Sequence, residues 1–188
     1  MRVIAGLRKG HTLLASPGRE VRPTSDRVRT VLFDILGEFV KDARVLDLFA
    51  GAGTLGIEAL SRGARFADFV ENQRPHAQLI QENLSRTHLE PHGRVILAEA
   101  FVFLSQPIAA PYQLVFADPP YRFEQVEKLF VLLNEKKVLM EEGMFVWEAS
   151  ARTPALHGES VWEMVKEKII GDTALRFYRR MPDAKASG

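Results

Sequence analysis

The sequence contains no cysteine among its 188 residues. This absence excludes disulfide bonds, cysteine-ligated zinc or iron–sulfur centres, and thiol catalysis. The five histidines show no metal-ligand spacing either. His88 and His92 are four residues apart, but Pro91 and Gly93 break any helix there. We therefore expect no metal site.

Long apolar runs are also missing. No stretch approaches the ~20 apolar residues that a membrane span requires, and the amino terminus lacks the apolar core of a signal peptide. We therefore expect a cytoplasmic protein without membrane contacts. The length suits one domain with a full core, and 46% hydrophobic and 26% charged residues are typical of a globular protein. We expect a monomer.

Positive charge is concentrated at the amino terminus, although the whole chain carries only +1. Residues 1–30 have a net charge of +5, and the rest of the chain has −4. A basic end on a near-neutral body suits the binding of a polyanion such as RNA, but a solvated basic face gives the same pattern. The candidate RNA-binding side chains are Arg2, Arg8, Lys9, Arg27 and Arg29.

Short strands and helices alternate from residue 44 onward. Repeated strand–helix units imply a parallel sheet with helices on both faces. Near the carboxyl end, Gly171-Asp172-Thr173 is a hairpin signal, which predicts an antiparallel pair at one edge of the sheet. The predicted strands are 44–49, 67–71, 94–98, 112–118, 144–149, 162–170 and 174–181, and the helices between them are 54–62, 75–87, 101–106 and 123–136.

The amino-terminal part has a different pattern. Residues 1–22 contain short extended segments joined by glycine-containing turns, which predicts a small basic β-hairpin extension. A helix with apolar residues at helical spacing then begins near Thr24 or Ser25, either of which can cap it. We divide the chain into the extension 1–22, an α/β domain 23–182 and a disordered tail 183–188.

A glycine-rich loop follows the first strand of the α/β domain. Gly51, Gly53 and Gly56 form G-x-G-x-x-G, and Glu71 stands twenty residues after the first glycine, at the end of the next strand. Glycine lets the backbone approach a ligand, a helix start offers free N–H groups, and the acid can accept hydrogen bonds from ribose hydroxyls. Structural turns often mimic the glycine spacing, but strand, helix and acid together predict a nucleotide site.

The loop is compatible with two cofactors, a nicotinamide dinucleotide and S-adenosylmethionine. No acid or base for hydride transfer is evident, which favours S-adenosylmethionine. Asp47, before the glycines, can hold an ammonium group, or it can be a turn acid at the end of a strand. Glu99, followed by Ala100 and Phe101, can meet the adenine amine, or it can be a solvated acid at a helix start.

The fourth predicted strand ends abruptly in Asp118-Pro119-Pro120-Tyr121. Proline has no N–H for a sheet and forces the preceding residue into an extended conformation, so the strand stops there. One carboxylate, a rigid corner with carbonyl groups and one flat ring remain. These are the groups needed to hold a planar base with an exocyclic amine, although an ordinary strand-to-loop turn looks the same in isolation.

The combination of Asp47–Gly56 and Asp118–Tyr121 resembles the S-adenosylmethionine-dependent amino-methyltransferases. Val21–Arg29 and Met1–Gly6 resemble the members that methylate the exocyclic N2 amine of a guanine in small-subunit (16S) ribosomal RNA. The resemblance implies a Rossmann-like class I methyltransferase with a doubly wound, mostly parallel seven-stranded sheet. It also implies 16S ribosomal RNA, or the assembling small subunit, as partner. Two alternatives stay open: an adenine-amine (N6) methyltransferase acting on RNA or DNA, and a non-catalytic nucleotide- or RNA-binding module.

The same resemblance implies roles for individual residues. Asp118–Tyr121 would bind the target base, and the glycines would hold the methionine half of the cofactor. Glu71 would bind the ribose and Glu99 the adenine, although the family more often carries Asp at the latter position. The implied cofactor-binding set is Arg22, Pro23, Thr24, Asp47, Phe49, Ala50, Gly51, Gly53, Glu71, Asn72, Glu99, Ala100, Phe101 and Asp118.

Overall fold

The computed structural model describes residues 1–15, 24–119, 125–156 and 161–182. The predictions for Arg22, Pro23, Pro120, Tyr121 and the tail lie outside these residues. Within them, the strands are β1 Arg44–Asp47, β2 Phe66–Glu71, β3 Gly93–Leu97, β4 Tyr112–Ala117, β5 Leu139–Ser150, β6 Trp162–Ile170 and β7 Thr173–Arg180.

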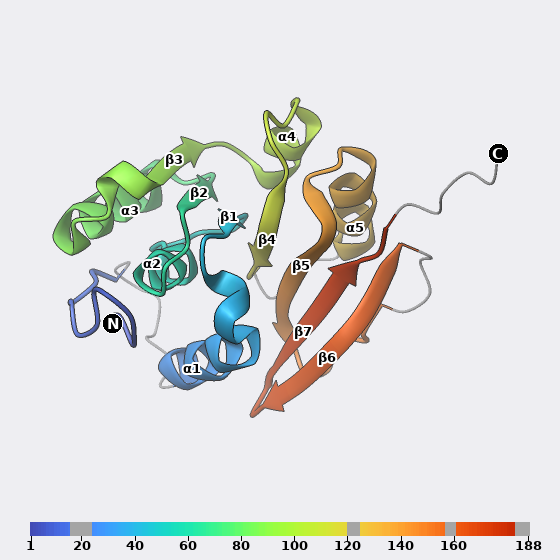
Figure 1. Cartoon of the computed structure of the whole chain (residues 1–188), viewed down its shortest axis with the longest axis horizontal. Coiled ribbons are helices and arrows are strands. Elements are labelled where there is room, and N and C mark those ends of the chain that lie inside the picture. The colour runs from blue at the N-terminus through green and yellow to red at the C-terminus, as the bar shows by residue number, and fades with distance from the viewer. Residues whose placement is uncertain (16–23, 120–124, 157–160, 183–188) are drawn as a thin grey trace.

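All of these strands belong to one sheet, with the order β3-β2-β1-β4-β5-β7-β6 (Figure 1). Strands β1 to β5 pair in parallel, whereas β7 is antiparallel to both β5 and β6. The predicted doubly wound sheet with an antiparallel hairpin at one edge is confirmed.

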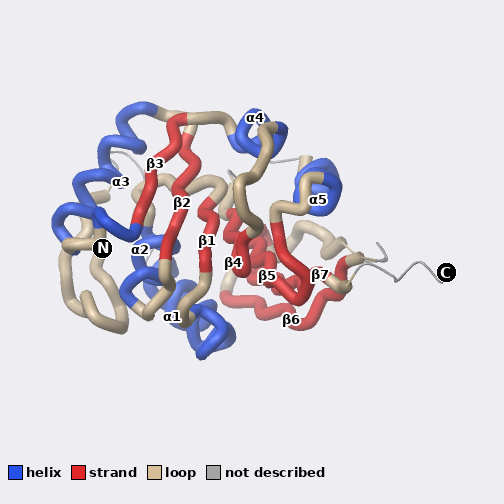
Figure 2. Tube along the Cα trace, turned by 45° about the horizontal axis from the view of Figure 1, so that its top comes forward, coloured by secondary structure: helices blue, strands red, loops and turns tan. Residues whose placement is uncertain are grey.

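Helices cover both faces of this sheet. Figure 2 shows α4 and α5 on one side of the strands and α1 and α2 on the other. No helix in the described residues is long and apolar enough to cross a membrane. The helices are α1 Thr24–Leu36, α2 Thr54–Ser61, α3 Arg74–Thr87, α4 Ala100–Ser105 and α5 Val126–Glu135, with short 3-10 turns at Gly37–Val40 and Glu90–His92.

The core has two apolar layers because successive strand residues point to opposite faces. In β4, Leu114 and Phe116 face the layer under α1, α2 and α3, whereas Val115 faces the layer under α4 and α5. Trp147 and Trp162 are buried in the second layer.

β5 differs most from its prediction. β5 begins five residues earlier than expected, at Leu139. The partner of Tyr112 is Leu139 and that of Leu114 is Met144, so β5 contains a bulge between these pairs. Glu142 within the bulge has φ 61. Charged residues and a glycine in this stretch hide the strand from its sequence pattern.

Candidate functional site

The carboxyl ends of β1, β2 and β4 lie side by side. Asp47 is in register with Phe69 of β2 and Phe116 of β4. Beyond the strands, the Leu48 N–H donates to the Phe116 carbonyl at 3.0 Å. The loop after each strand therefore opens on the same crevice, which is where open α/β sheets bind ligands.

A cavity of about 330 Å³ lies at this edge of the sheet, a volume typical of small-molecule sites. Its lining includes eight of the predicted cofactor residues: Phe49, Gly51, Glu71, Asn72, Glu99, Ala100, Phe101 and Asp118. The sequence analysis missed six others that line it, namely Leu48, Val70, Gln73, His76, Ala98 and Gln125. Strand-end apolar residues look like ordinary core, and the polar ones belong to no motif.

The three glycines of the motif are required for different structural reasons. Gly51 (φ 56) and Gly53 (φ 78) adopt left-handed backbone conformations that side chains disfavour. Gly56 lies in α2, where an added Cβ would stand 2.3 Å from the buried ring of Phe69. The first two glycines therefore shape the loop, and the third allows close packing between helix and strand.

Glu71 links β2 to the glycine loop and is 7% exposed. One carboxylate oxygen accepts the Gly51 N–H at 2.9 Å, and the other accepts the Gln73 N–H at 2.8 Å. Each oxygen keeps a second lone pair. Glu71 can therefore accept hydrogen bonds from two ribose hydroxyls while it holds the loop, so the cavity fits a nucleoside.

Two further acids line the cavity from other elements. Glu99 occupies the N-cap position of α4 and is exposed, so its carboxylate is available to an amine such as that of adenine. Asp118 directly follows β4 and is partly buried, with Pro119 beside it. Acids at the ends of β2, β3 and β4 thus converge on one cavity.

Asp47 does not line the cavity, as an acid that binds the ligand would. It is 1% exposed, is not among the residues that line the cavity, and accepts the Gly56 N–H at 3.1 Å. Ala50 and Gly53 of the loop are also buried and are not among the residues that line the cavity. These contacts favour the interpretation of Asp47 as a turn acid that fixes the start of α2.

The environment of Asp47 predicts a pH-dependent stability. Burial raises the pKa of Asp47 to about 7, and the nearby charges of Asp118 and Glu71 add to this. The carboxyl pKa in the unfolded chain is about 3.9. The folded state therefore binds the proton more tightly than the unfolded chain. The contribution of Asp47 to the free energy of unfolding falls as pH rises from about 4 to about 7 and is level above that.

Asp47→Asn is expected to remove this component. Asparagine can still accept the Gly56 N–H but carries no charge. Thermal unfolding should show the variant gaining stability relative to the wild type between pH 4 and pH 8. A difference between the two proteins that stays constant across this range would contradict the assignment.

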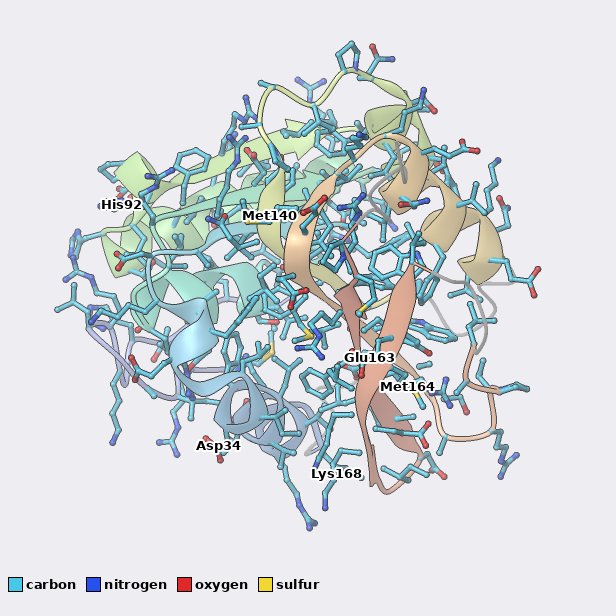
Figure 3. The ribbon with its side chains drawn as sticks, turned by 45° about the vertical axis from the view of Figure 1, so that its right-hand side comes forward. Asp34, His92, Met140, Glu163, Met164 and Lys168 are labelled. Carbon is cyan, nitrogen blue, oxygen red and sulfur yellow. The ribbon has the colours of Figure 1, made fainter. Side chains whose placement is uncertain are left out.

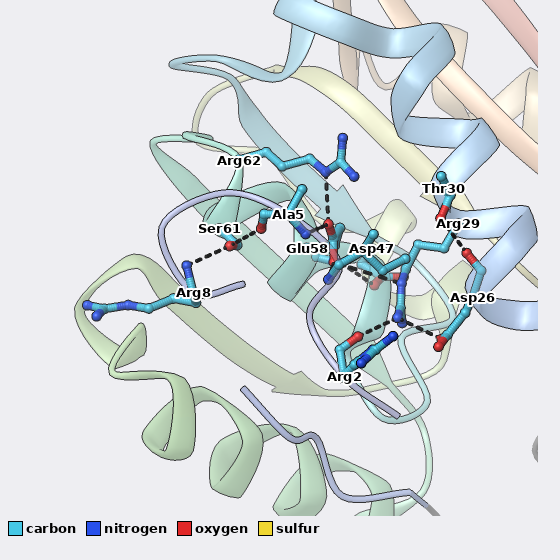
Figure 4. A network of polar contacts seen from close by, with 12 residues as sticks. Arg2, Ala5, Arg8, Asp26, Arg29, Thr30, Asp47, Glu58, Ser61 and Arg62 are labelled. Atoms are coloured by element: carbon cyan, nitrogen blue, oxygen red, sulfur yellow. Dashed lines mark hydrogen bonds and ion pairs between the residues drawn. The ribbon is translucent and has the colours of Figure 1, made fainter. Parts of the chain in front are cut away.

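The amino-terminal arm, residues 1–15, is fastened to the domain by buried polar groups (Figure 4). Its ends are joined by an antiparallel bridge between Arg2 and Thr12. Glu58 of α2, only 1% exposed, accepts the N–H groups of Ile4 at 2.8 Å and Ala5 at 3.0 Å. Its carboxylate also pairs with Arg62 at 2.8 Å.

Arg29 belongs to the same network, so its prediction as an RNA-binding residue is wrong. Its side chain is 3% exposed, and its guanidinium donates to the Arg2 carbonyl at 2.6 Å and to Asp26 at 2.9 Å. Burial lowers the pKa of this guanidinium, although the charge of Glu58 opposes the shift. Arg29 holds the arm on α1 and cannot present its charge to RNA.

The other predicted cations differ among themselves. Arg2, Lys9 and Arg27 are exposed, whereas Arg8 is partly buried and donates to the His88 carbonyl at 3.3 Å. Glu58 was missed in the sequence analysis. The available signal was an acid between Ile57 and Ala59 in a short helix that has no other charged residue.

The strand order and the cavity at the carboxyl edge define a class of protein, the Rossmann-like class I methyltransferases. Comparison with known proteins agrees. The family described as "Conserved hypothetical protein 95" matches residues 1–179. Ribosomal RNA small subunit methyltransferase D of Escherichia coli K12 is 36% identical over 180 residues, which cover 96% of this chain and 90% of that protein.

A second relative and a solved structure support the same family. Ribosomal RNA small subunit methyltransferase D of Haemophilus influenzae is 35% identical over 181 residues, covering 95% of this chain and 93% of that protein. The solved structure of the Escherichia coli yhhF protein is 36% identical, covers 97% of this chain and 99% of that one, and superimposes with a TM-score of 0.88. The chain belongs to the ribosomal RNA small subunit methyltransferase D family.

The resemblance to this family and the fold class are thereby confirmed. S-adenosylmethionine stays the expected cofactor. The residues at the cavity fit this cofactor, because Glu71 can serve a ribose and Gly51 brings bare backbone to the cavity wall. The described residues contain no group of three or more metal-ligating side chains.

Proposed function

We propose that this protein transfers a methyl group from S-adenosylmethionine to the exocyclic N2 amine of a guanine in small-subunit (16S) ribosomal RNA. One observation carries the proposal: Asp118 lines the same cavity as Gly51 and Glu71. A target amine held by Asp118 therefore lies next to the cofactor site. The names of the relatives support ribosomal RNA as the substrate.

S-adenosylmethionine would supply a methyl group on a positively charged sulfur: the amine nitrogen bonds to the methyl carbon in line as the sulfur–carbon bond breaks, and the nitrogen then loses one proton. The protein's part is to make a poor nucleophile reactive, since the guanine amine's lone pair is delocalised into the ring. The Asp118 carboxylate and the Pro119 carbonyl would accept hydrogen bonds from the amine, which draws the nitrogen towards tetrahedral geometry and localises its lone pair. Alignment of this kind contributes ~7–11 kcal/mol in well-oriented systems, so no strong base is required.

Two other parts of the proposal come from the arm and from the resemblance. Tyr121, for which the resemblance implies a stacking role, would fix the plane of the base. A base in a helix must first leave its stack, at a cost of roughly a few kcal/mol. Phosphate contacts from Arg2, Lys9 and Arg27, whose side chains are exposed, can offset that cost.

The combined substitution Lys9→Ala and Arg27→Ala should weaken RNA binding and make it less sensitive to salt. Each lost phosphate contact lowers the slope of log K against log salt concentration by about 0.7–0.9. A reduction of about 1.4–1.8 is therefore expected in binding titrations at several salt concentrations. The matched control is Lys168→Ala, an exposed lysine on the edge strand β6, outside the arm (Figure 3). Equal salt-dependence slopes for the wild type, the double variant and the control would show that these cations form a solvated basic face that does not bind RNA.

The proposal as a whole is tested by methyl transfer from labelled S-adenosylmethionine to free ribosomal RNA, to small subunits and to DNA. Label in a guanine of small-subunit RNA supports it. Label in adenine would support the adenine-amine alternative, and no transfer to any of the three would support a non-catalytic module.

A further inference from the structure

Asn83 joins two segments that are distant in the sequence. It lies on α3 and is completely buried. Its side-chain oxygen accepts the Leu14 N–H at 2.7 Å, and its amide nitrogen donates to the carbonyls of Leu14 at 3.1 Å and Ala52 at 2.9 Å. Leu14 lies near the end of the described arm, and Ala52 belongs to the glycine loop. One side chain therefore holds both segments.

The bond from Asn83 fixes a peptide group next to the cofactor site. In the Ala52–Gly53 peptide, the Ala52 carbonyl accepts the hydrogen bond from Asn83. The Gly53 N–H of the same peptide donates to the Ala50 carbonyl at 2.7 Å. Gly51, one residue before this peptide, lines the cavity and donates its N–H to Glu71. A rotation of the Ala52 carbonyl away from Asn83 would therefore disturb the part of the loop that faces the ligand.

We propose that Asn83 is a positioning residue that couples cofactor binding in the glycine loop to the placement of the arm, and through the arm to RNA binding. This inference rests on the proposed function, in which the arm contacts RNA. Loss of the Asn83 bonds leaves partly buried backbone groups without these partners, which is unfavourable, so loop and arm are ordered together. A ligand that orders the loop then favours the bound position of the arm, and by linkage RNA strengthens cofactor binding by the same factor.

The test compares Asn83→Ala with Ser61→Ala. Within the described residues, both hydrogen bonds of the Ser61 hydroxyl go to the arm: it donates to the Ala5 carbonyl at 2.6 Å and accepts the Arg8 N–H at 2.9 Å. The probe is S-adenosylhomocysteine, titrated by calorimetry with and without a 16S RNA fragment. In the wild type, RNA should tighten its binding at least about fivefold. Asn83→Ala should weaken binding without RNA about tenfold and remove the tightening, whereas Ser61→Ala should leave binding without RNA unchanged. Wild-type affinity and wild-type tightening in Asn83→Ala would overturn the proposal.

A measurement on the wild type covers the case in which Asn83→Ala does not fold. Hydrogen exchange of the Leu14 amide, which donates to Asn83, should slow when the protein is saturated with S-adenosylhomocysteine. Normal binding of this ligand with an unchanged Leu14 exchange rate overturns the coupling alone. No binding to the wild type overturns the cofactor site of the proposed function, and the coupling with it.

Discussion

Replacing Asp118 by alanine is expected to lower kcat for methyl transfer by about 10²–10⁴-fold, the range typical for a positioned catalytic carboxylate. The dissociation constant of S-adenosylhomocysteine should change little, because Glu71, Gly51 and Glu99 still line the cofactor part of the cavity. The experiment therefore measures kcat and the dissociation constant of the cofactor analogue separately. It distinguishes a residue that holds the target amine from one that shapes the cofactor site.

Two further variants sharpen this result. Asp118→Asn keeps one oxygen that can accept an amine N–H but loses the charge, so an intermediate loss of kcat is expected. Asp34→Ala is the matched control, because Asp34 is an exposed acid on α1 (Figure 3). Single-turnover methyl transfer with saturating cofactor measures the effect directly. Full activity of Asp118→Ala would remove Asp118 from the catalytic role.

Replacing Glu58 by glutamine is expected to have the largest effect on stability. The two oxygens of this buried carboxylate serve Ile4, Ala5 and Arg62, with Arg29 at 3.9 Å. Glutamine has a similar shape but offers one oxygen and no charge. Removing one partner of a buried ion pair typically costs about 3–5 kcal/mol.

Denaturant unfolding of Glu58→Gln measures this loss, with Glu127→Gln as control because Glu127 is exposed in the first turn of α5. The amide protons of Ile4 and Ala5 should exchange faster in the variant, since their acceptor is weakened. A free energy of unfolding within about 1 kcal/mol of the wild type would show that the network is not essential, since surface-like substitutions fall in that range.

Local patterns predicted most of the architecture. The alternation of apolar strands and amphipathic helices determines the α/β class, and Gly171-Asp172-Thr173 marks the final hairpin. The positions of Gly51, Glu71 and Asp118 at strand ends were enough to expect one shared site, because parallel strands bring their carboxyl ends together. The first half of β5 was missed since its bulge has no periodic pattern.

Long-range polar contacts could not be predicted in this way. Arg29 belongs to a basic segment, and only the folded chain shows that its charge is buried beside Glu58 of α2. In the sequence, Asn83 looks like an ordinary polar residue of a helix. Only the fold shows that it bonds to Leu14 and Ala52. A buried polar side chain is identified by its partners, and residues far apart in the sequence supply those partners.

The most direct test of the central claim is to identify the nucleoside that carries the label after methyl transfer to small-subunit ribosomal RNA. The proposed function predicts label in N2-methylguanosine with the wild-type protein, and its near absence with Asp118→Ala at full cofactor occupancy. Label in N6-methyladenosine, or equal labelling by both proteins, would contradict it.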